Sequence, residues 1–332
     1  MSVKCASVAL SLLLSHLVFR YVEVPLRRRR ADGRLLLGGL LALALTAALC
    51  GLVRKAEGVP QRLSDADRAA LALITRDYPV PPEHRCAHDI GSRCWTDAGA
   101  GKADVLMVGN SHAEHFIPAL SKTAPAGVNV DIVGAGGAFP LWDWAEGYSK
   151  RELARSRNMR DVLAYAAQSP APVILVSTTG LAGAPDDPVH LLDGSTRRFD
   201  EVLDLTARKL MGASRKVFFL VDNPAFPVEM ETCLALRPVS VGSRACTISR
   251  QAYERSREAF RKAIAPLTKR YPGRVFLLET GSAHCDESVC SMVTPLGQPR
   301  YVDTHHYNEV GATEAAALIW KRLAPYLPHG SS

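Results

Sequence analysis

Three patterns that would indicate other classes of protein are missing from this sequence. No two of its 8 cysteines have the C-x2-C spacing, so a structural zinc site is the weaker explanation for them. The run Gly134–Gly137 lacks the G-x-G-x-x-G spacing of dinucleotide-binding proteins. The net charge is +7, but no stretch interleaves basic residues with aromatic ones, and we therefore expect no nucleic-acid partner.

Charge is also missing from a long apolar run near the start of the chain. Leu35–Val53 contains no charged residue, and at about 1.5 Å per residue it spans roughly 29 Å, enough to cross a bilayer. We predict a transmembrane helix over residues 34–54. Cys5–Phe19 is a second, shorter apolar run, and no small-residue cleavage pattern follows it. We interpret it as a membrane helix rather than a signal peptide.

The loop between the two apolar runs carries the four arginines Arg27–Arg30. The positive-inside rule places this loop in the cytoplasm, so everything after Arg54 is predicted to lie on the other side of the inner (plasma) membrane, in the periplasm or outside the cell. Six cysteines follow Arg54 in close couples, for which local disulfides are the simplest pairing in an oxidising compartment. The expected pairs are Cys86–Cys94, Cys233–Cys246 and Cys285–Cys290.

A globular domain is expected over residues 85–329, after a polar, proline-containing linker over residues 55–84. Within the domain, short apolar runs alternate with helical patterns, which is typical of a parallel sheet covered on both faces. We predict a three-layer α/β/α fold with about five parallel strands, preceded by two transmembrane helices. The strands are expected at 104–108, 128–133, 173–176, 216–221 and 274–278, and the helices at 114–122, 152–168, 199–211, 250–270 and 309–327.

Ser111 stands where the first predicted strand passes into a helix. A serine on such a turn is exposed beside the N–H groups of the helix N-terminus, which can stabilise a developing oxyanion. Asp303 and His306 follow the last predicted strand and precede the last predicted helix. Because ligands gather at the carboxyl ends of the strands in an open α/β sheet, we expect the three side chains to meet there.

The spacing Asp303-x-x-His306 suits a catalytic triad with Ser111. The acid can bind Nδ1–H of the imidazole, which leaves Nε2 as the base for the serine. His305, one residue closer to the acid, is the rival base, and we favour His306. The alternative is that Asp303 caps a turn and both histidines are surface residues.

Other residues near the predicted sheet edge complete the candidate site. The backbone N–H of Ser111, a glycine such as Gly137 and Thr178 are candidate oxyanion donors, since the last two follow the second and third strands. His112 and His115 flank the serine, either as donors behind it or as packed histidines. We predict no metal site and no cofactor.

Three stretches carry a family resemblance: Tyr21–Arg28, Gly109–His112, and Asp303–His306 with its trailing Gly311-Ala312. The chain resembles the C-terminal part of an acyltransferase-3 membrane protein with a fused SGNH-type (GDSL-like) domain. The resemblance implies that residues 1–30 are the remnant of the last helix of the acyltransferase-3 domain, and that the chain is the tail of a longer protein. Two departures are Asn110, where the family has aspartate, and the absence of an asparagine from the block that supplies one to many SGNH oxyanion holes.

The resemblance implies an extracytoplasmic O-acyltransferase, acting most simply with acetyl groups. Ser111 would be the nucleophile, His306 the base and Asp303 its orienting acid. The acceptor would be a cell-surface glycan such as lipopolysaccharide, exopolysaccharide or peptidoglycan, and a membrane acyltransferase domain would deliver the acyl donor. The alternatives are an SGNH esterase or deacetylase, and a non-catalytic glycan-binding partner of a membrane acyltransferase.

Overall fold

The computed structural model describes ten segments of the chain: residues 2–24, 33–55, 65–74, 78–86, 90, 93–97, 103–145, 147–178, 185–235 and 246–327. The chain divides into two compact units, Met1–Asp65 and Ala66–Ser332. The arginine run Arg27–Arg30 and much of the predicted linker lie outside the described residues.

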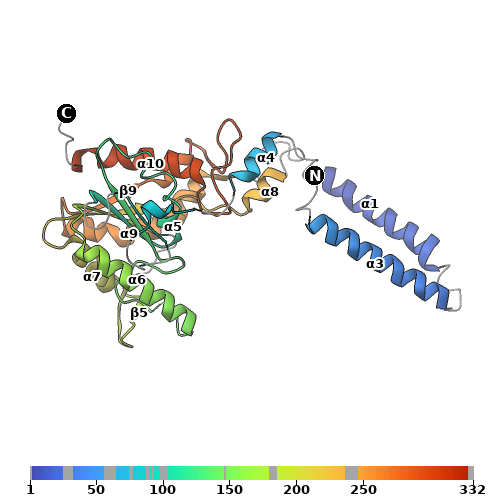
Figure 1. The fold of residues 1–332 in the computed structure, drawn as a ribbon, viewed down its shortest axis with the longest axis horizontal. Coiled ribbons are helices and arrows are strands. Elements are labelled where there is room, and N and C mark those ends of the chain that lie inside the picture. Colours follow the sequence, from blue (N-terminus) through green and yellow to red (C-terminus); the bar gives the residue numbers. More distant parts are fainter. Residues whose placement is uncertain are drawn as a thin grey trace. The chain divides into compact units, whose positions relative to one another are not determined.

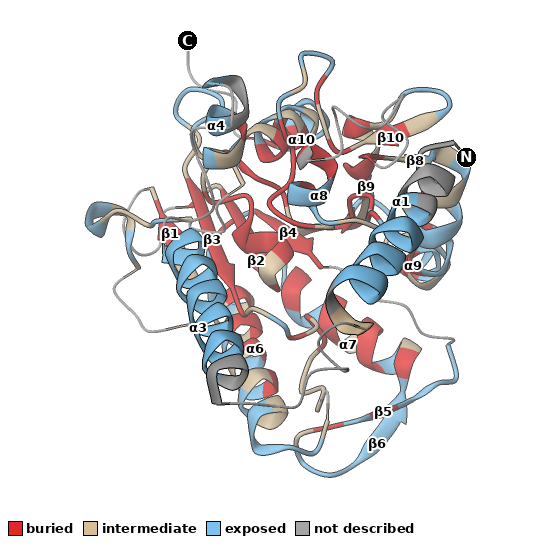
Figure 2. Cartoon of the chain, turned by 90° about the vertical axis from the view of Figure 1, so that its right-hand side faces the viewer, coloured by how far each residue is buried: buried red, intermediate tan, exposed pale blue. Residues whose placement is uncertain are grey.

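The described residues of the first unit are mostly helical. Helix α1 (Ser2–Val18) continues into a short π-helix, η1 (Phe19–Glu23), and α3 covers Gly33–Lys55. Among the described residues, one stretch is long and apolar enough to cross a membrane, Leu37–Lys55, and none of it is buried (Figure 2). The apolar stretch Leu10–Tyr21 is shorter. The structure thus supports the second of the two predicted membrane helices by length and composition, and does not show the first.

The second unit is built on a six-stranded sheet with the strand order β1-β3-β2-β4-β7-β9. Five strands run parallel, as the sequence predicts: β2 Val105–Gly109, β3 Val130–Gly134, β4 Val173–Ser177, β7 Lys216–Val221 and β9 Val275–Glu279. Every residue of β2, β3 and β4 is buried, because helices cover both faces (Figure 2). The order in which strands are added to the sheet reverses at β2, since β3 lies on one side of it and β4 on the other. Ligands bind at such a switch point in open α/β sheets.

Helices form a layer on each face of the sheet, which gives the predicted three-layer α/β/α fold (Figure 1). Helix α10 (Glu309–Leu323) and the segment after α5 (Ser111–Glu114) pack on the face that includes Val105 and Met107. On the other face lie α6 (Lys150–Gln168), α7 (Phe199–Met211) and much of α9 (Arg250–Arg270). The alternating side chains of β2 divide between these two cores, as the period of a strand requires.

Two differences from the prediction concern the sheet and the helix that follows β2. The α-helix after β2 is only α5 (Ser111–Glu114), and turns follow it in place of the helix expected over 114–122. Pro118 accounts for this, because proline lacks the N–H that a helix needs and disfavours helical geometry in the residue before it. An extra edge strand, β1 (Arg93–Thr96), pairs antiparallel with β3.

All three expected disulfides form: Cys86–Cys94, Cys233–Cys246 and Cys285–Cys290. They link the segment after the 3-10 turn η3 (Pro82–His84) to the edge strand at Arg93–Thr96, α8 (Met230–Ala235) to the residue before β8 (Thr247–Ser249), and the end of the 3-10 turn η5 (Gly281–His284) to β10 (Val289–Ser291). The other small elements are α4 (Asp65–Ala72), the hairpin of β5 (Pro188–His190) and β6 (Thr196–Arg198), and the 3-10 turn η6 (Ala324–Tyr326).

Candidate active site

Ser111 is the first residue of α5 and lies directly beyond the carboxyl end of β2. The turn is tight: a Cβ atom at Gly109 would lie 1.7 Å from the carbonyl oxygen of Ser177, so only glycine fits there. The hydroxyl of Ser177 donates to the carbonyl of His112 at 2.7 Å and fastens α5 to the end of β4. The turn therefore holds Ser111 at the switch point of the sheet.

Asn110 caps the helix that Ser111 begins. Its Oδ1 accepts a hydrogen bond from the backbone N–H of His112 at 3.0 Å, and its Nδ2 donates to Oγ1 of Thr178 at 3.1 Å. An ionised aspartate at this position could accept the first bond but could not donate the second. Asn110 thus links α5 to the residue after β4 as a donor, where an aspartate could form the link only by accepting from the Thr178 hydroxyl group.

Ser111, His306 and Asp303 form a continuous hydrogen-bonded chain. Oγ of Ser111 lies 2.7 Å from Nε2 of His306, and Nδ1 of His306 lies 2.7 Å from Oδ2 of Asp303. The side chain of Asp303 is only 6% exposed. Its other oxygen, Oδ1, accepts hydrogen bonds from the backbone N–H groups of His305 and His306, so the carboxylate is held from both sides. This arrangement fixes the imidazole with Nε2 toward the serine.

The rival base, His305, has its Nδ1 3.7 Å from Oδ1 of Asp303, farther than the 2.7 Å that separates Nδ1 of His306 from the same carboxylate. Nδ1 of His305 lies 2.7 Å from Oγ1 of Thr304, and 34% of its side chain is exposed. The loop that carries both histidines is tied to the segment after β7. Nδ2 of Asn223 donates to the carbonyl of His305, and the backbone N–H of Phe226 donates to that of Thr304.

A second histidine–carboxylate pair lies beside the first and was not predicted. His112 is completely buried, and its Nδ1 lies 2.6 Å from Oδ1 of Asp222, the residue after β7. Nη2 of Arg257 lies 3.4 Å from the other oxygen of Asp222. Asp222 follows the fourth parallel strand, so its place at the carboxyl edge of the sheet was the signal that could have marked it.

His115 is a packed residue. Its Nδ1 accepts a hydrogen bond from the backbone N–H of Tyr307 at 3.3 Å, and only 1% of the residue is exposed. Burial lowers the pKa of His115 well below its usual value, and the neighbouring imidazoles of His112 and His306 lower it further. His115 is therefore neutral and contributes packing rather than charge.

The further oxyanion candidates lie in the regions expected. Gly137 is exposed in the loop after β3, with a φ of 78° that favours glycine. Thr178 is buried, and its hydroxyl group accepts the bond from Asn110. Thr179 and Gly180 lie outside the described residues. The assignment of Gly137 and Thr178 to an oxyanion hole stays a prediction.

A three-layer α/β/α domain with Ser, His and Asp at the carboxyl edge of its parallel sheet has the architecture of the SGNH class of hydrolase-like domains. The chain belongs to the family described as the SGNH domain fused to AT3 domains, which matches residues 79–321. One solved structure similar to it is the periplasmic domain of a lipopolysaccharide acetyltransferase from Salmonella ser. Paratyphi A. The identity is 15%, with 68% of this chain and 85% of that chain covered and a TM-score of 0.48. None of the curated protein sequences matches the chain significantly.

Proposed function

We propose that this protein is an extracytoplasmic O-acyltransferase that moves an acyl group, most simply acetyl, to a cell-surface glycan. The observation that carries the proposal is the hydrogen-bonded chain from Ser111 through His306 to Asp303. Membership of a family whose SGNH domains are fused to AT3 domains favours acyl transfer over unrelated uses of the same side chains.

The reaction has two halves. Oγ of Ser111 attacks the carbonyl carbon of the acyl donor while Nε2 of His306 takes the hydroxyl proton, and His306 then gives that proton to the leaving group. A sugar hydroxyl next attacks the serine ester and loses its proton to His306, which returns it to Ser111. Asp303 keeps the imidazole in the required tautomer and stabilises its positive charge in both halves.

The oxyanion that forms in each half needs hydrogen-bond donors. The backbone N–H of Ser111 is one candidate, since the first N–H groups of a helix have no partner within the helix. We assign Gly137 and Thr178 as the further donors, because both follow strands that end at the same edge as β2.

The same proposal places the globular domain in the periplasm or outside the cell, anchored in the inner (plasma) membrane by residues 34–54. Three disulfides are typical of an oxidising compartment, and the span Leu37–Lys55 can cross a bilayer. Residues 55–84 then link the anchor to the SGNH domain at 85–329. A membrane acyltransferase domain would deliver the acyl group, and the acceptor would be lipopolysaccharide, exopolysaccharide or peptidoglycan.

The purified full chain, kept in detergent, tests the proposal with an activated acetyl ester and a glycan acceptor. We expect acetyl groups to appear on the glycan faster than free acetate appears, and Ser111→Ala to abolish both. Ser195→Ala, which removes an exposed hydroxyl group from the β5–β6 hairpin region, is the matched control. Release of acetate with no transfer to any glycan would indicate an esterase. Unchanged glycan acylation by Ser111→Ala would indicate a binding role.

A further inference from the structure

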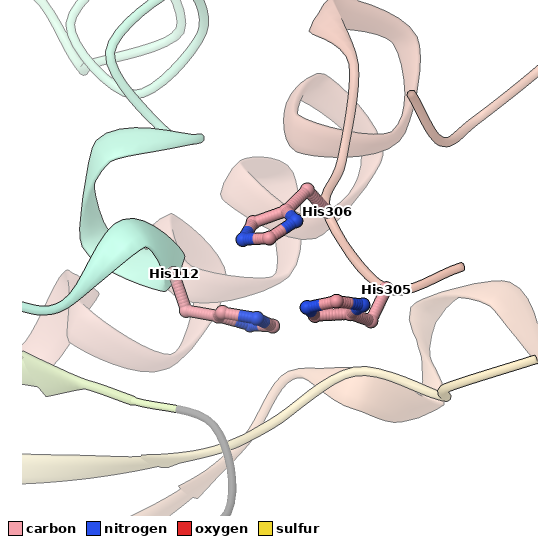
Figure 3. A group of neighbouring side chains, drawn as sticks. All are labelled: His112, His305 and His306. Carbon is pink, nitrogen blue, oxygen red and sulfur yellow. The ribbon is translucent and has the colours of Figure 1, made fainter. Parts of the chain in front are cut away.

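We propose that His112, His305 and His306 form a binding site for a divalent transition-metal ion such as Zn²⁺. One ring nitrogen from each of the three histidines lies within 4.8 Å of the other two. Figure 3 shows the three rings gathered around one point, with His112 and His305 facing each other and His306 beside them. The sequence offers no motif for this site, since 193 positions separate His112 from His305 (305 − 112).

The three ring nitrogens need to move only slightly closer together to coordinate Zn²⁺. Zn–N bonds are about 2.0–2.1 Å long, so two ligand nitrogens in a tetrahedral site lie about 3.4 Å apart. Closing separations of up to 4.8 Å to about 3.4 Å is within the reach of side-chain rotation. His305 is the most exposed of the three, with 34% of its side chain accessible, so protein atoms surround its ring least.

His112 provides the observation that points to a ligand. Its side chain is completely buried, and its Nε2 has no hydrogen-bond partner among the residues that the structure describes. A buried polar atom left without a partner costs about 1–3 kcal/mol. A metal ion bound to this nitrogen would satisfy it.

Nδ1 of each histidine is already held by an oxygen atom, which leaves Nε2 as the nitrogen for a metal ion. Nδ1 of His112 lies 2.6 Å from Asp222, Nδ1 of His306 lies 2.7 Å from Asp303, and Nδ1 of His305 lies 2.7 Å from Thr304. Metal-bound histidines almost always have such an outer partner, which fixes the tautomer and leaves the second nitrogen for the metal. Two of the three partners are carboxylates, and they also favour a cation electrostatically.

Three imidazole nitrogens suit Zn²⁺, Cu²⁺, Ni²⁺ and Co²⁺ far better than Mg²⁺ or Ca²⁺, which prefer oxygen ligands. Bound at this point, the metal takes the nitrogen with which His306 contacts Ser111. That nitrogen can no longer accept the serine proton. Metal binding is therefore expected to inhibit acyl transfer reversibly, a consequence that rests on the proposed function.

Competition with a chromophoric chelator measures Zn²⁺ binding by the full chain in detergent, and Co²⁺ absorption reports the geometry. We expect one metal ion per chain, with an affinity at least about tenfold weaker in His112→Ala and in His305→Ala. His190→Ala is the matched control, because Nδ1 of His190 also contacts a threonine hydroxyl group but lies on the β5–β6 hairpin. It should bind zinc as the wild type does.

Two results would overturn the site: no zinc bound by the wild type, or an affinity that neither histidine substitution changes. If the buried His112→Ala variant does not fold, the partly exposed His305 decides the question alone. Labelling of Ser111 by a fluorophosphonate separates this inference from the proposed function. If zinc binds through the histidines but the fluorophosphonate does not label Ser111, the metal site stands and the proposed function is refuted. If the fluorophosphonate labels Ser111, zinc does not slow the labelling and no zinc is bound, the proposed function stands and the metal site is refuted.

Discussion

Ser111 Oγ lies 2.7 Å from His306 Nε2, although 195 positions separate the two residues in the chain. The contact forms because Ser111 follows the strand at the switch point of the sheet and the loop before α10 returns to the same edge. Backbone hydrogen bonds to Asp303 fix the loop, and Asn110 fixes the serine turn. The fold thus positions both reacting groups before any substrate binds.

The choice of base is testable with two neighbouring residues. His306→Ala should lower kcat/KM for acyl transfer by about 10³-fold or more, because Ser111 loses the group that takes its proton. His305→Ala should cost far less, since His305 contacts Thr304 rather than the serine. Both rates are measured with a chelator present. Equal losses in the two variants would contradict the assignment of His306.

Asp303→Asn should lower kcat by about 10²- to 10⁴-fold with little change in KM. The amide can still accept from the backbone N–H groups of His305 and His306, so the loop should keep its shape. It cannot hold the imidazole in the tautomer that leaves Nε2 free for Ser111. Steady-state kinetics gives the loss, and near-UV circular dichroism checks the fold. A variant that keeps full activity would refute the role of Asp303.

Asn110→Ala removes both the helix cap and the bond to Thr178. We expect the free energy of unfolding to fall by about 1–2 kcal/mol and kcat/KM to fall as well, because the cap positions Ser111. Ser249→Ala is the matched control, since Ser249 caps α9 with a bond to the N–H of Ala252. Its stability should fall by about 1 kcal/mol with activity retained. Equal activity in both variants would show that the Asn110 cap does not position the serine.

The ionisation of Glu314 should make the free energy of unfolding depend on pH. Its Oε2 lies 3.2 Å from Nε2 of His284 and 2.6 Å from Nε of Arg300. Burial raises the pKa of Glu314, but the contacts with His284 and Arg300 outweigh burial and lower that pKa from 4.5 to about 2. A carboxyl group with a lowered pKa stabilises the fold above its unfolded-state pKa, and this contribution is lost as the pH falls toward the folded-state value.

Glu314→Gln should therefore lower the Tm at neutral pH, with a loss that shrinks between about pH 4.5 and about pH 2. The expected cost is about 1 kcal/mol, because solvent screens a side chain that is 36% exposed. Glu258→Gln, which removes the exposed pair with Lys262, should change the Tm much less. A Tm difference for Glu314→Gln that stays constant across this pH range would contradict the assignment.

The parallel strands could be predicted because each is a short apolar run, which is a local signal. Ser111, Asp303 and His306 could be predicted because they follow predicted strands whose carboxyl ends share one edge of the sheet. The pair of His112 with Asp222 was missed because it joins the ends of two different strands, 110 positions apart in the chain. The helix expected over 114–122 does not form, because Pro118 removes a backbone N–H that the helix would need. The antiparallel strand β1 was missed because its four residues carry little pattern of their own.

The most direct test of the whole account is to trap the acyl-enzyme. The full chain is incubated with an activated acetyl ester, quenched in acid and digested, and the peptides are weighed by mass spectrometry. We predict one added acetyl group on the peptide that contains Ser111, absent from Ser111→Ala and discharged when a glycan acceptor is added. Acetylation at another residue, or a Ser111 peptide that never gains the group while transfer proceeds, would contradict the account.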